Sequence, residues 1–337
     1  MLDHKPIATQ LTQMLKISYP VIMAPMFLVS DTRMVIEAAK CGITGAIPAL
    51  NYRNTAELHK ALEELSKQCP GPFGINLIAN KSNVQLKDQL NACLEHKVSY
   101  IITSLGNPEN IIKECHRKGI LVFCDVVDEK YARKVESLGA DALIAVNANA
   151  GGHAGNLKPE VLIPLLKDAC HIPIISAGGV GDGAGLKQML DLGACGISMG
   201  SPFIASVESP VSDDYKQACV QYNAEDIVMT TKLSGTPCTV INTPFVQKTG
   251  TSQNALERLL NKSRSLKKFV KMLTFFRGMQ QLRKAAFSNT YKSVWCAGPS
   301  IAYVKAIKSI AEIVDALLDG YYKAGESGQK TENDDKI

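Results

Sequence analysis

The stretch Ala142-Leu-Ile-Ala-Val-Asn-Ala-Asn-Ala-Gly-Gly-His-Ala-Gly155 joins a short apolar strand to a glycine-rich turn, and a helix is predicted from about Pro159. A strand made only of apolar residues is typical of a parallel sheet that is covered on both faces. Glycines leave a thin backbone around His153, so this histidine is placed to meet a ligand. The alternative is that the glycines only make a tight turn and that His153 caps the next helix.

The same unit of strand, turn and helix recurs along the chain. The predicted strands are residues 19–26, 43–47, 73–77, 98–103, 119–124, 140–146, 172–176 and 195–199. Apolar strands that alternate with amphipathic helices indicate an α/β fold with a parallel sheet. Eight such units close most naturally into a (β/α)8 TIM barrel. An open doubly wound sheet is the alternative, but its Gly-x-Gly-x-x-Gly is missing after the first strand, which ends in Ala24-Pro-Met26.

The regular pattern ends after Phe203, and this break predicts the domain organisation. Residues 1–206 and 294–322 are expected to form the barrel, with a closing helix over residues 301–318. Residues 207–293 are expected to form a small, mainly helical inserted domain that covers the substrate pocket. The polar, charged residues 323–337 are predicted to be a disordered tail.

Composition and charge narrow the class of protein. Hydrophobic residues make up 46% of the chain and charged residues 20%, which is typical of a soluble globular protein. A net charge of +5 is modest for 337 residues and does not favour nucleic acid as a partner. No signal sequence and no membrane-spanning apolar run is found, so we expect a cytoplasmic protein. The sequence leaves the oligomeric state, including a homodimer, open.

Cysteines and basic residues follow no pattern that demands a special site. The ten cysteines are scattered, with no Cys-x-x-Cys pair, so we expect reduced thiols and no metal. Basic residues concentrate between positions 262 and 284, where apolar residues interleave with them at helical spacing. This pattern predicts an amphipathic helix with a solvated basic face. The alternative is a contact with an acidic partner or a phosphorylated cosubstrate.

Two glycine-rich loops are suited to a phosphate. Ser176-Ala-Gly-Gly-Val-Gly-Asp-Gly183 follows the seventh strand, and Met199-Gly-Ser-Pro202 follows the eighth. Glycines let backbone N–H groups approach an anion, and the helix that begins near Gly183 adds its positive end. Barrels often bind the phosphate of a ligand between these two loops.

Together with these loops, three further motifs carry a resemblance. Ala24-Pro-Met26, Gly74-Ile-Asn76 and Ala150-Gly-Gly-His-Ala-Gly155, with the two loops, resemble the nitronate monooxygenase family, formerly called 2-nitropropane dioxygenases. Flavin-dependent enoyl-ACP reductases are close relatives that share these motifs. The resemblance extends over about residues 15 to 320 and implies a barrel that binds FMN.

The resemblance also implies roles for individual residues. Ala24, Pro25 and Met26 would lie against the flavin ring, and Asn76 would bond its polar edge. His153 would be the catalytic base. The remaining residues expected to bind the cofactor, mostly at its phosphate, are Gly152, Gly178, Gly179, Gly200 and Ser201.

Three positions depart from the family's pattern. Asp125 follows Cys124 at the end of the fifth strand, where nitronate-oxidising members often carry a basic residue. Asn149 stands where the reductases usually have an acidic residue, and Pro202 replaces a common arginine. The substrate therefore stays open, although FMN remains the expected cofactor.

The expected reaction requires the protein to transfer one proton, because the flavin itself accepts the electrons. His153 lies in a glycine-rich loop after a strand, whereas His4, His59, His96, His116 and His171 lie in polar or helix-flanking segments. With an ordinary pKa near 6.5, His153 could take the α-proton of a nitroalkane or hydrogen-bond an anionic nitronate. Cys124 as a nucleophile is an alternative, and for Asp125 a polar contact to flavin or substrate is open.

Three functions fit these observations. The first is an FMN-dependent nitronate monooxygenase, in which O2 converts the nitronate into a carbonyl compound and nitrite. The second is an NAD(P)H-dependent flavin reductase that acts on an enoyl thioester or a quinone. The third is a barrel that binds flavin without turnover.

Overall fold

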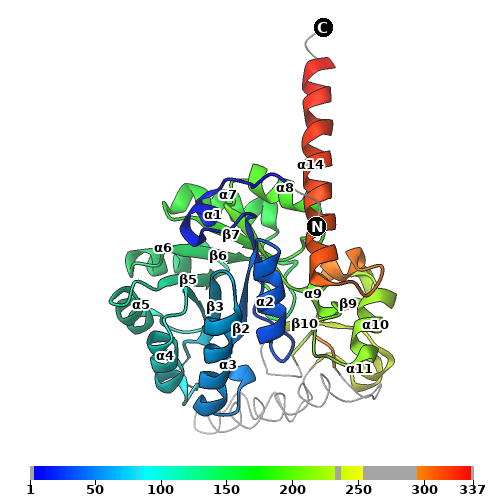
Figure 1. Ribbon diagram of the computed structural model, residues 1–337. Coiled ribbons are helices and arrows are strands. Elements are labelled where there is room, and N and C mark those ends of the chain that lie inside the picture. Colours follow the sequence, from blue (N-terminus) through cyan, green and yellow to red (C-terminus); the bar gives the residue numbers. More distant parts are fainter. Residues whose placement is uncertain (1–3, 81, 232–236, 253–293, 335–337) are drawn as a thin grey trace.

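Eight parallel strands close into a barrel in the computed structural model, which describes residues 4–80, 82–231, 237–252 and 294–334 (Figure 1). The strands are β1 Val21–Met23, β2 Thr44–Pro48, β3 Phe73–Ile78, β4 Tyr100–Ser104, β5 Leu121–Val126, β6 Ala142–Val146, β7 Ile174–Ala177 and β8 Gly196–Met199. Each strand pairs in parallel with the next, and β8 pairs with β1 to close the ring. The predicted (β/α)8 TIM barrel is therefore confirmed, with every predicted strand in place.

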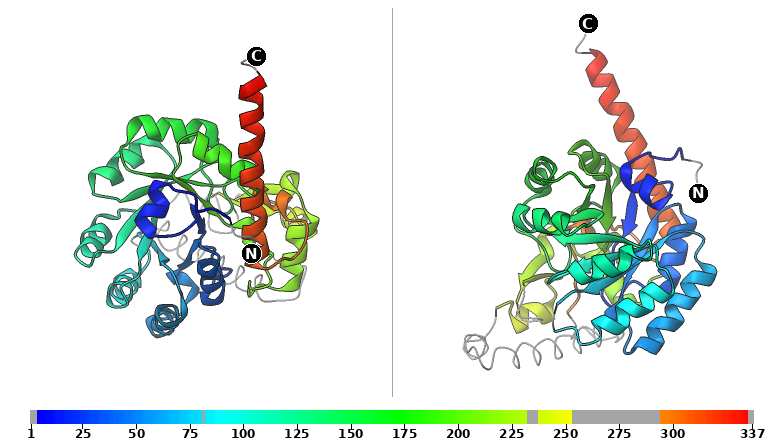
Figure 2. Two further views of the ribbon diagram at one scale, coloured as in Figure 1. Left: turned by 45° about the horizontal axis from the view of Figure 1, so that its top comes forward. Right: turned by 90° about the vertical axis from the view of Figure 1, so that its left-hand side faces the viewer.

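Helices surround the barrel as an outer ring, which Figure 2 shows from two further sides. The ring consists of α2 Thr32–Lys40, α3 Thr55–Gln68, α4 Leu86–Glu95, α5 Glu109–His116, α6 Glu129–Ser137, α7 Pro159–Ala169 and α8 Gly183–Asp191. The short helix α1, Gln10–Leu15, closes the amino-terminal end of the barrel, where Leu11 and Leu15 pack with interior residues such as Ile22. Ligands therefore have to enter at the carboxyl ends of the strands.

Side chains of each strand alternate between the barrel interior and the layer of helices. On β5, Phe123 packs inside the barrel with Tyr100, whereas Cys124 packs against the surrounding helices. The Tyr100 and Phe123 rings stack with centroids 5.1 Å apart. A β-carbon on Gly74 would lie 2.2 Å from the Tyr100 ring, so this position of the Gly74-Ile-Asn76 motif is required by interior packing. The alternation fixes which residues at the strand ends face the mouth.

The chain leaves the barrel after β8 and returns at residue 294. The described elements of this part are α9 Ser201–Ile204, α10 Asp213–Gln221, η2 Ala224–Asp226, β9 Ile227–Thr230, β10 Cys238–Ile241 and α11 Pro244–Thr249. β9 and β10 form an antiparallel hairpin. The basic segment 262–284 lies outside the described residues, and a separate, mainly helical domain over residues 207–293 stays a prediction.

The closing helix begins later and ends later than the sequence predicts. Residues 299–303 form a 3₁₀ helix, η3 Pro299–Tyr303, and α14 runs from Ile310 to Asp334. Our prediction of a helix from residue 301 is wrong because Ser309 and Glu312 form a capping box: Ser309 N donates to Glu312 Oε2 at 2.8 Å, and Glu312 N donates to Ser309 Oγ at 3.2 Å.

The predicted disorder from residue 323 also differs from the structure, because α14 continues through residue 334 and projects beyond the barrel (Figure 1). Extending an existing helix costs little once its first turns are packed, and Ala324 and Glu326 are good helix formers. Within the described residues, no helix combines the length and apolar character that crossing a membrane would need.

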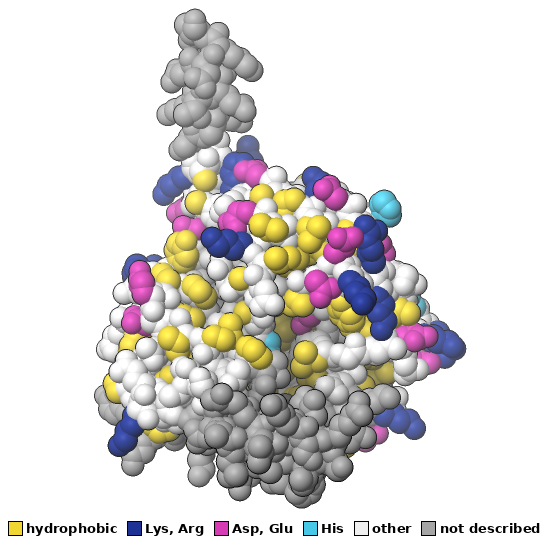
Figure 3. Space-filling view, turned by 180° about the vertical axis from the view of Figure 1, so that it is seen from behind, with side chains coloured by type: hydrophobic (Ala, Val, Ile, Leu, Met, Phe, Trp, Pro, Cys, Tyr) yellow, Lys and Arg dark blue, Asp and Glu magenta, His cyan; other side chains and the backbone are white. Residues whose placement is uncertain are grey.

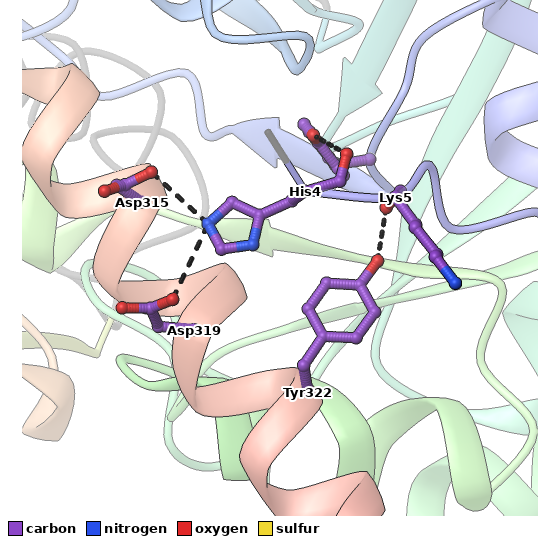
Figure 4. Close-up of polar contacts among 6 residues, drawn as sticks. His4, Lys5, Asp315, Asp319 and Tyr322 are labelled. Carbon is purple, nitrogen blue, oxygen red and sulfur yellow. Dashed lines mark hydrogen bonds and ion pairs between the residues drawn. The ribbon is translucent and has the colours of Figure 1, made fainter. Parts of the chain in front are cut away.

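The amino-terminal segment is fastened to α14 (Figure 4). Tyr322 Oη donates to the backbone oxygen of Lys5, and His4 Nε2 lies 3.3 Å from Asp315 Oδ1 and 3.7 Å from Asp319 Oδ1. These contacts hold the segment that leads into α1 against the helix that closes the ring.

α14 packs against α8 so closely that only glycine fits at the contact. A β-carbon on Gly183 would lie 2.0 Å from Tyr321 N and 2.3 Å from Leu317 O. We predict that Gly183→Ala lowers the free energy of unfolding by about 1–3 kcal/mol or more, because backbone atoms must move apart. Urea unfolding measures this loss.

Gly325→Ala, on the partner helix α14, is the control for the same chemical change, since a β-carbon there meets no atom within 4 Å. This change should stabilise the protein by up to about 1 kcal/mol through helix propensity. Equal unfolding midpoints for the parent and Gly183→Ala would contradict the packing described here.

Candidate active site

The loop after β6 is anchored by Asn147, which the sequence did not single out. Asn147 is fully buried, its Nδ2 donates to Gly178 O at 3.1 Å, and its Oδ1 accepts from Asn149 N at 2.8 Å. One side chain thus ties the loop that carries His153 to the loop after β7. His153 does not cap α7, whose N-cap is Lys158. The alternative in which His153 is a helix cap is therefore wrong.

The loops after β6, β7 and β8 approach one another through glycine. Gly178 and Gly179 have φ values of 117° and 85°, and a β-carbon on Gly178 would lie 2.5 Å from Ala150 N. A β-carbon on Gly151 would lie 2.9 Å from Gly298 N and 3.2 Å from Ser201 Oγ. No other residue type allows these approaches. The structure therefore brings the two predicted phosphate loops together beside the His153 loop.

Backbone amides in these loops remain available to a ligand. In the part of the chain that the structure describes, the N–H groups of Gly178, Gly179, Gly200 and Ser201 donate to no other residue. Neighbouring backbone N–H groups of this kind form a concave site for an anion. The N-terminus of α8 offers an anion less positive potential than the sequence predicts, because the Asp182 carboxylate already caps it by accepting a hydrogen bond from Gly185 N at 2.9 Å.

The loop after β1 lies against the loop after β8. Ala24 N donates to Met199 O at 2.8 Å, and a β-carbon on Gly200 would lie 3.4 Å from Met26 Sδ and 3.5 Å from the β-carbon of Ala24. Ala24, Pro25 and Met26 are all half-buried. The residues predicted to face the flavin ring are thus adjacent to those predicted to hold its phosphate.

Polar side chains at the ends of β3, β4 and β5 form a continuous network. Asn76 Nδ2 donates to Ser104 Oγ at 2.7 Å and to Ile102 O at 3.2 Å, and Ser104 Oγ donates to Asp125 Oδ2 at 2.5 Å. Burial raises the pKa of the Asp125 carboxyl to about 6, although the hydrogen bond from Ser104 opposes this shift. Ser104 has no counterpart in our sequence prediction, because nothing in the local sequence marks it.

Cys124 is directed away from this site. Its thiol packs among the residues under the helices, and Thr103 Oγ1 donates to Cys124 Sγ at 3.2 Å. Burial raises the pKa of the thiol to about 12, so very little thiolate exists at neutral pH. These facts argue against the alternative in which Cys124 is a nucleophile.

His153 lies on the rim of the mouth, beside the inserted hairpin. Thr239 N donates to Gly152 O at 2.8 Å, and Thr239 Oγ1 donates to Ala150 O at 3.1 Å. The imidazole is exposed by surface area, yet partial burial by the rim lowers its pKa below the usual value. The exposed surface area and the lowered pKa together fit an imidazole ring that water reaches from one side only. The lowered pKa favours the neutral imidazole at pH 7.

All of the predicted site residues lie at the carboxyl end of the barrel, on the loops after β1, β6, β7 and β8 and at the end of β3. The structure adds Asn147, Ser104, Asp125 and Thr239 to them. On the face seen in Figure 3, hydrophobic side chains border a hollow in the surface. The roles of the individual residues toward a cofactor stay predictions.

Comparison with known proteins places this geometry in a family. The family model described as nitronate monooxygenase matches residues 82–320. A protein of Rhodococcus jostii (strain RHA1), named (3aS,4S,5R,7aS)-5-hydroxy-7a-methyl-1-oxo-octahydro-1H-indene-4-carboxyl-CoA dehydrogenase, is 31% identical over 264 residues, which cover 78% of this chain and 74% of the relative.

Two further similarities point the same way. A protein of Staphylococcus saprophyticus named probable nitronate monooxygenase is 28% identical over 72% of this chain and 81% of its own length. The solved structure of FabK from Thermotoga maritima superposes with a TM-score of 0.85 and 29% identity, over 96% of this chain and 99% of FabK.

The raised pKa of Asp125 has a consequence for stability. The pKa of Asp125 rises from 3.8 to about 6 on folding, so the folded state binds this proton more tightly than the unfolded state. The free energy of unfolding is therefore highest below pH 3.8 and falls as the pH rises through 6. We predict that Asp125→Asn, which can still accept from Ser104, stabilises the protein by about 1–3 kcal/mol at pH 8. Urea unfolding at pH 5 and pH 8 measures this gain.

The gain should be smaller at pH 5 by about 1 kcal/mol, since much of the carboxyl is then protonated in the folded state. A gain that is the same at both pH values, or a loss at pH 8, would show that burial does not raise this pKa.

Proposed function

Because the chain belongs to the nitronate monooxygenase family, and is thus an oxidoreductase, we propose that it is an FMN-dependent enzyme that oxidises alkyl nitronates with O2. The products are a carbonyl compound and nitrite. One observation carries the proposal: His153, with a lowered pKa, lies on a loop that touches both glycine loops with available amides.

The residues at the barrel mouth fit FMN. The amides of Gly178, Gly179, Gly200 and Ser201 suit its phosphate, because they lack acceptors among the described residues. Ala24 and Met26, next to Gly200, offer an apolar surface for a planar ring, and Asn76 offers a polar group at the neighbouring strand ends. FMN, when bound, supplies the electron acceptor that no side chain provides.

His153 would manage the proton. A neutral imidazole can accept the α-proton of a nitroalkane or donate a hydrogen bond to a nitronate oxygen, depending on which ring nitrogen carries hydrogen. Proton transfer by a placed side chain typically contributes about 10²–10⁴-fold to a rate. The hydrogen bonds from Thr239 to the His153 loop would keep the ring in position while substrate binds.

A second candidate is a flavin-dependent oxidoreductase of acyl thioesters that uses NAD(P)H. One similarity favours it: the R. jostii relative is named a carboxyl-CoA dehydrogenase. The same glycine loops and flavin surface would serve this reaction, but the electrons would come from a dinucleotide. The side chain of Asn149 lies next to Gly179, since a β-carbon on Gly179 would be 2.9 Å from the β-carbon of Asn149. Asn149 would then lie near the phosphate, where the reductases usually have an acidic residue.

Flavin absorbance separates the two candidates. The purified protein, loaded with FMN and kept anaerobic, is mixed with ethyl nitronate, with NADH, with NADPH or with an acyl-CoA. We predict that the nitronate bleaches the flavin and that admitted O2 restores the absorbance and releases nitrite. Bleaching by NADH or NADPH alone would favour the second candidate and overturn the first.

Replacement of His153 tests the proton step. We predict that His153→Ala keeps FMN but loses about 10²–10⁴-fold of turnover on a neutral nitroalkane, with a smaller loss on the preformed nitronate. His171→Ala is the matched control, since His171 is exposed and precedes β7, at the opposite end of the barrel. Unchanged nitroalkane turnover in His153→Ala removes this residue from the mechanism.

A further inference from the structure

Asp125 is a half-buried ionisable group that the reaction described above does not use. On β5, Phe123 faces the barrel interior and Cys124 faces the helices, so Asp125 faces the interior one layer above Phe123. The same alternation directs Ser104 inward on β4 and Asn76 inward on β3. The carboxyl therefore lies in the upper interior layer, where the mouth begins.

Hydrogen-bond direction fixes this group as an acceptor. Ile102 O can only accept, so the atom of Asn76 beside it must be the amide nitrogen, whose other hydrogen goes to Ser104 Oγ. Ser104 therefore receives a hydrogen bond from Asn76 and donates its own hydrogen to Asp125 Oδ2. The network holds the carboxyl in one orientation and favours its ionised form against the cost of burial.

The charge of Asp125 has no opposite charge beside it in the described chain. None of the ion pairs among the described residues includes Asp125, and burial and the Ser104 hydrogen bond are the causes that set its pKa. The other titratable side chain that we place at this mouth is His153, and burial lowers its pKa below the usual value, which favours the neutral imidazole. Among the described residues, the mouth thus carries one carboxyl group with no opposite charge beside it.

We propose that Asp125 is a specificity-determining residue, whose carboxylate makes the site accept the neutral nitroalkane and disfavour the free nitronate anion. This inference rests on the proposed function and narrows its substrate. With a neutral imidazole, a nitronate that enters from solution raises the summed charge of Asp125, His153 and substrate from −1 to −2, and like charges within one site repel each other.

A neutral nitroalkane avoids this cost. When His153 takes the α-proton, the carbon–hydrogen bond breaks, a nitrogen–hydrogen bond forms, and the electron pair stays on the substrate as the nitronate. The summed charge remains −1, because the new imidazolium offsets the new anion. Asp125 and His153 thus favour the same substrate, the neutral nitroalkane: Asp125 repels a nitronate that enters from solution, and His153 forms the nitronate within the site.

Sulfite tests the charge without any turnover, because it is an anion that adds to an oxidised flavin and bleaches its absorbance. We expect FMN-loaded Asp125→Asn to bind sulfite at least about tenfold more tightly than the parent, since one repulsive charge is gone. Asp168→Asn makes the same chemical change on the exposed surface of α7, and Cys124→Ala changes the neighbouring residue under the helices. Both controls should match the parent.

Initial rates test the substrate preference in the same proteins. The ratio of kcat/KM for nitronate to that for nitroalkane should rise at least about tenfold in Asp125→Asn, through a lower KM for the nitronate. Flavin content and circular dichroism establish that the variant is folded and loaded.

The possible results separate this inference from the proposed function. Equal sulfite affinity in the parent and a loaded Asp125→Asn overturns the role of Asp125, even if nitronates are oxidised. A tenfold change in sulfite affinity without turnover of any nitro compound keeps the anion exclusion and overturns the proposed function instead. An unchanged rate ratio in an active variant overturns the substrate preference.

Discussion

The close approach of three loop backbones is the constraint on which the rest of the mouth depends. Gly178 contacts Ala150, and Gly151 contacts Gly298 and Ser201, at distances that exclude a β-carbon. Because these backbones pack directly, Asn147 can bridge the first two loops, and Gly298 N can donate to Ser201 Oγ at 2.8 Å. The amides that are not used in this packing remain as a group, which is what an anionic ligand needs.

The inserted hairpin completes the same arrangement from above. Thr239 on β10 bonds the loop after β6 at Ala150 and Gly152, so His153 is flanked by a barrel contact on one side and an insert contact on the other. Any movement of the hairpin would therefore reposition His153. The two titratable groups of the mouth lie on β5, which carries Asp125, and on the loop after the neighbouring strand β6, which carries His153. Burial makes Asp125 harder to ionise and His153 harder to protonate.

Much of this could be predicted from the sequence, since the apolar strands and the glycines carry local signals. Residues 142–146 are recognisable as a buried strand without any knowledge of their neighbours, and eight such strands close most naturally into a barrel. The start of α14 was missed because the apolar pattern from residue 301 outweighed the Ser309–Glu312 capping box. Thr239 and Ser104 carry no local signal, since their site partners are 89 and 21 residues away in the chain.

In the proposed function, the backbone amides around Gly179 and Gly200 hold the phosphate of a flavin mononucleotide. Titration of the flavin-free protein with FMN and with riboflavin, which has the same ring but no phosphate, tests it most directly. We expect FMN to bind at least about 100-fold more tightly than riboflavin, in keeping with charge-assisted hydrogen bonds from several amides. Equal affinity for the two flavins, or no binding of either, would contradict it.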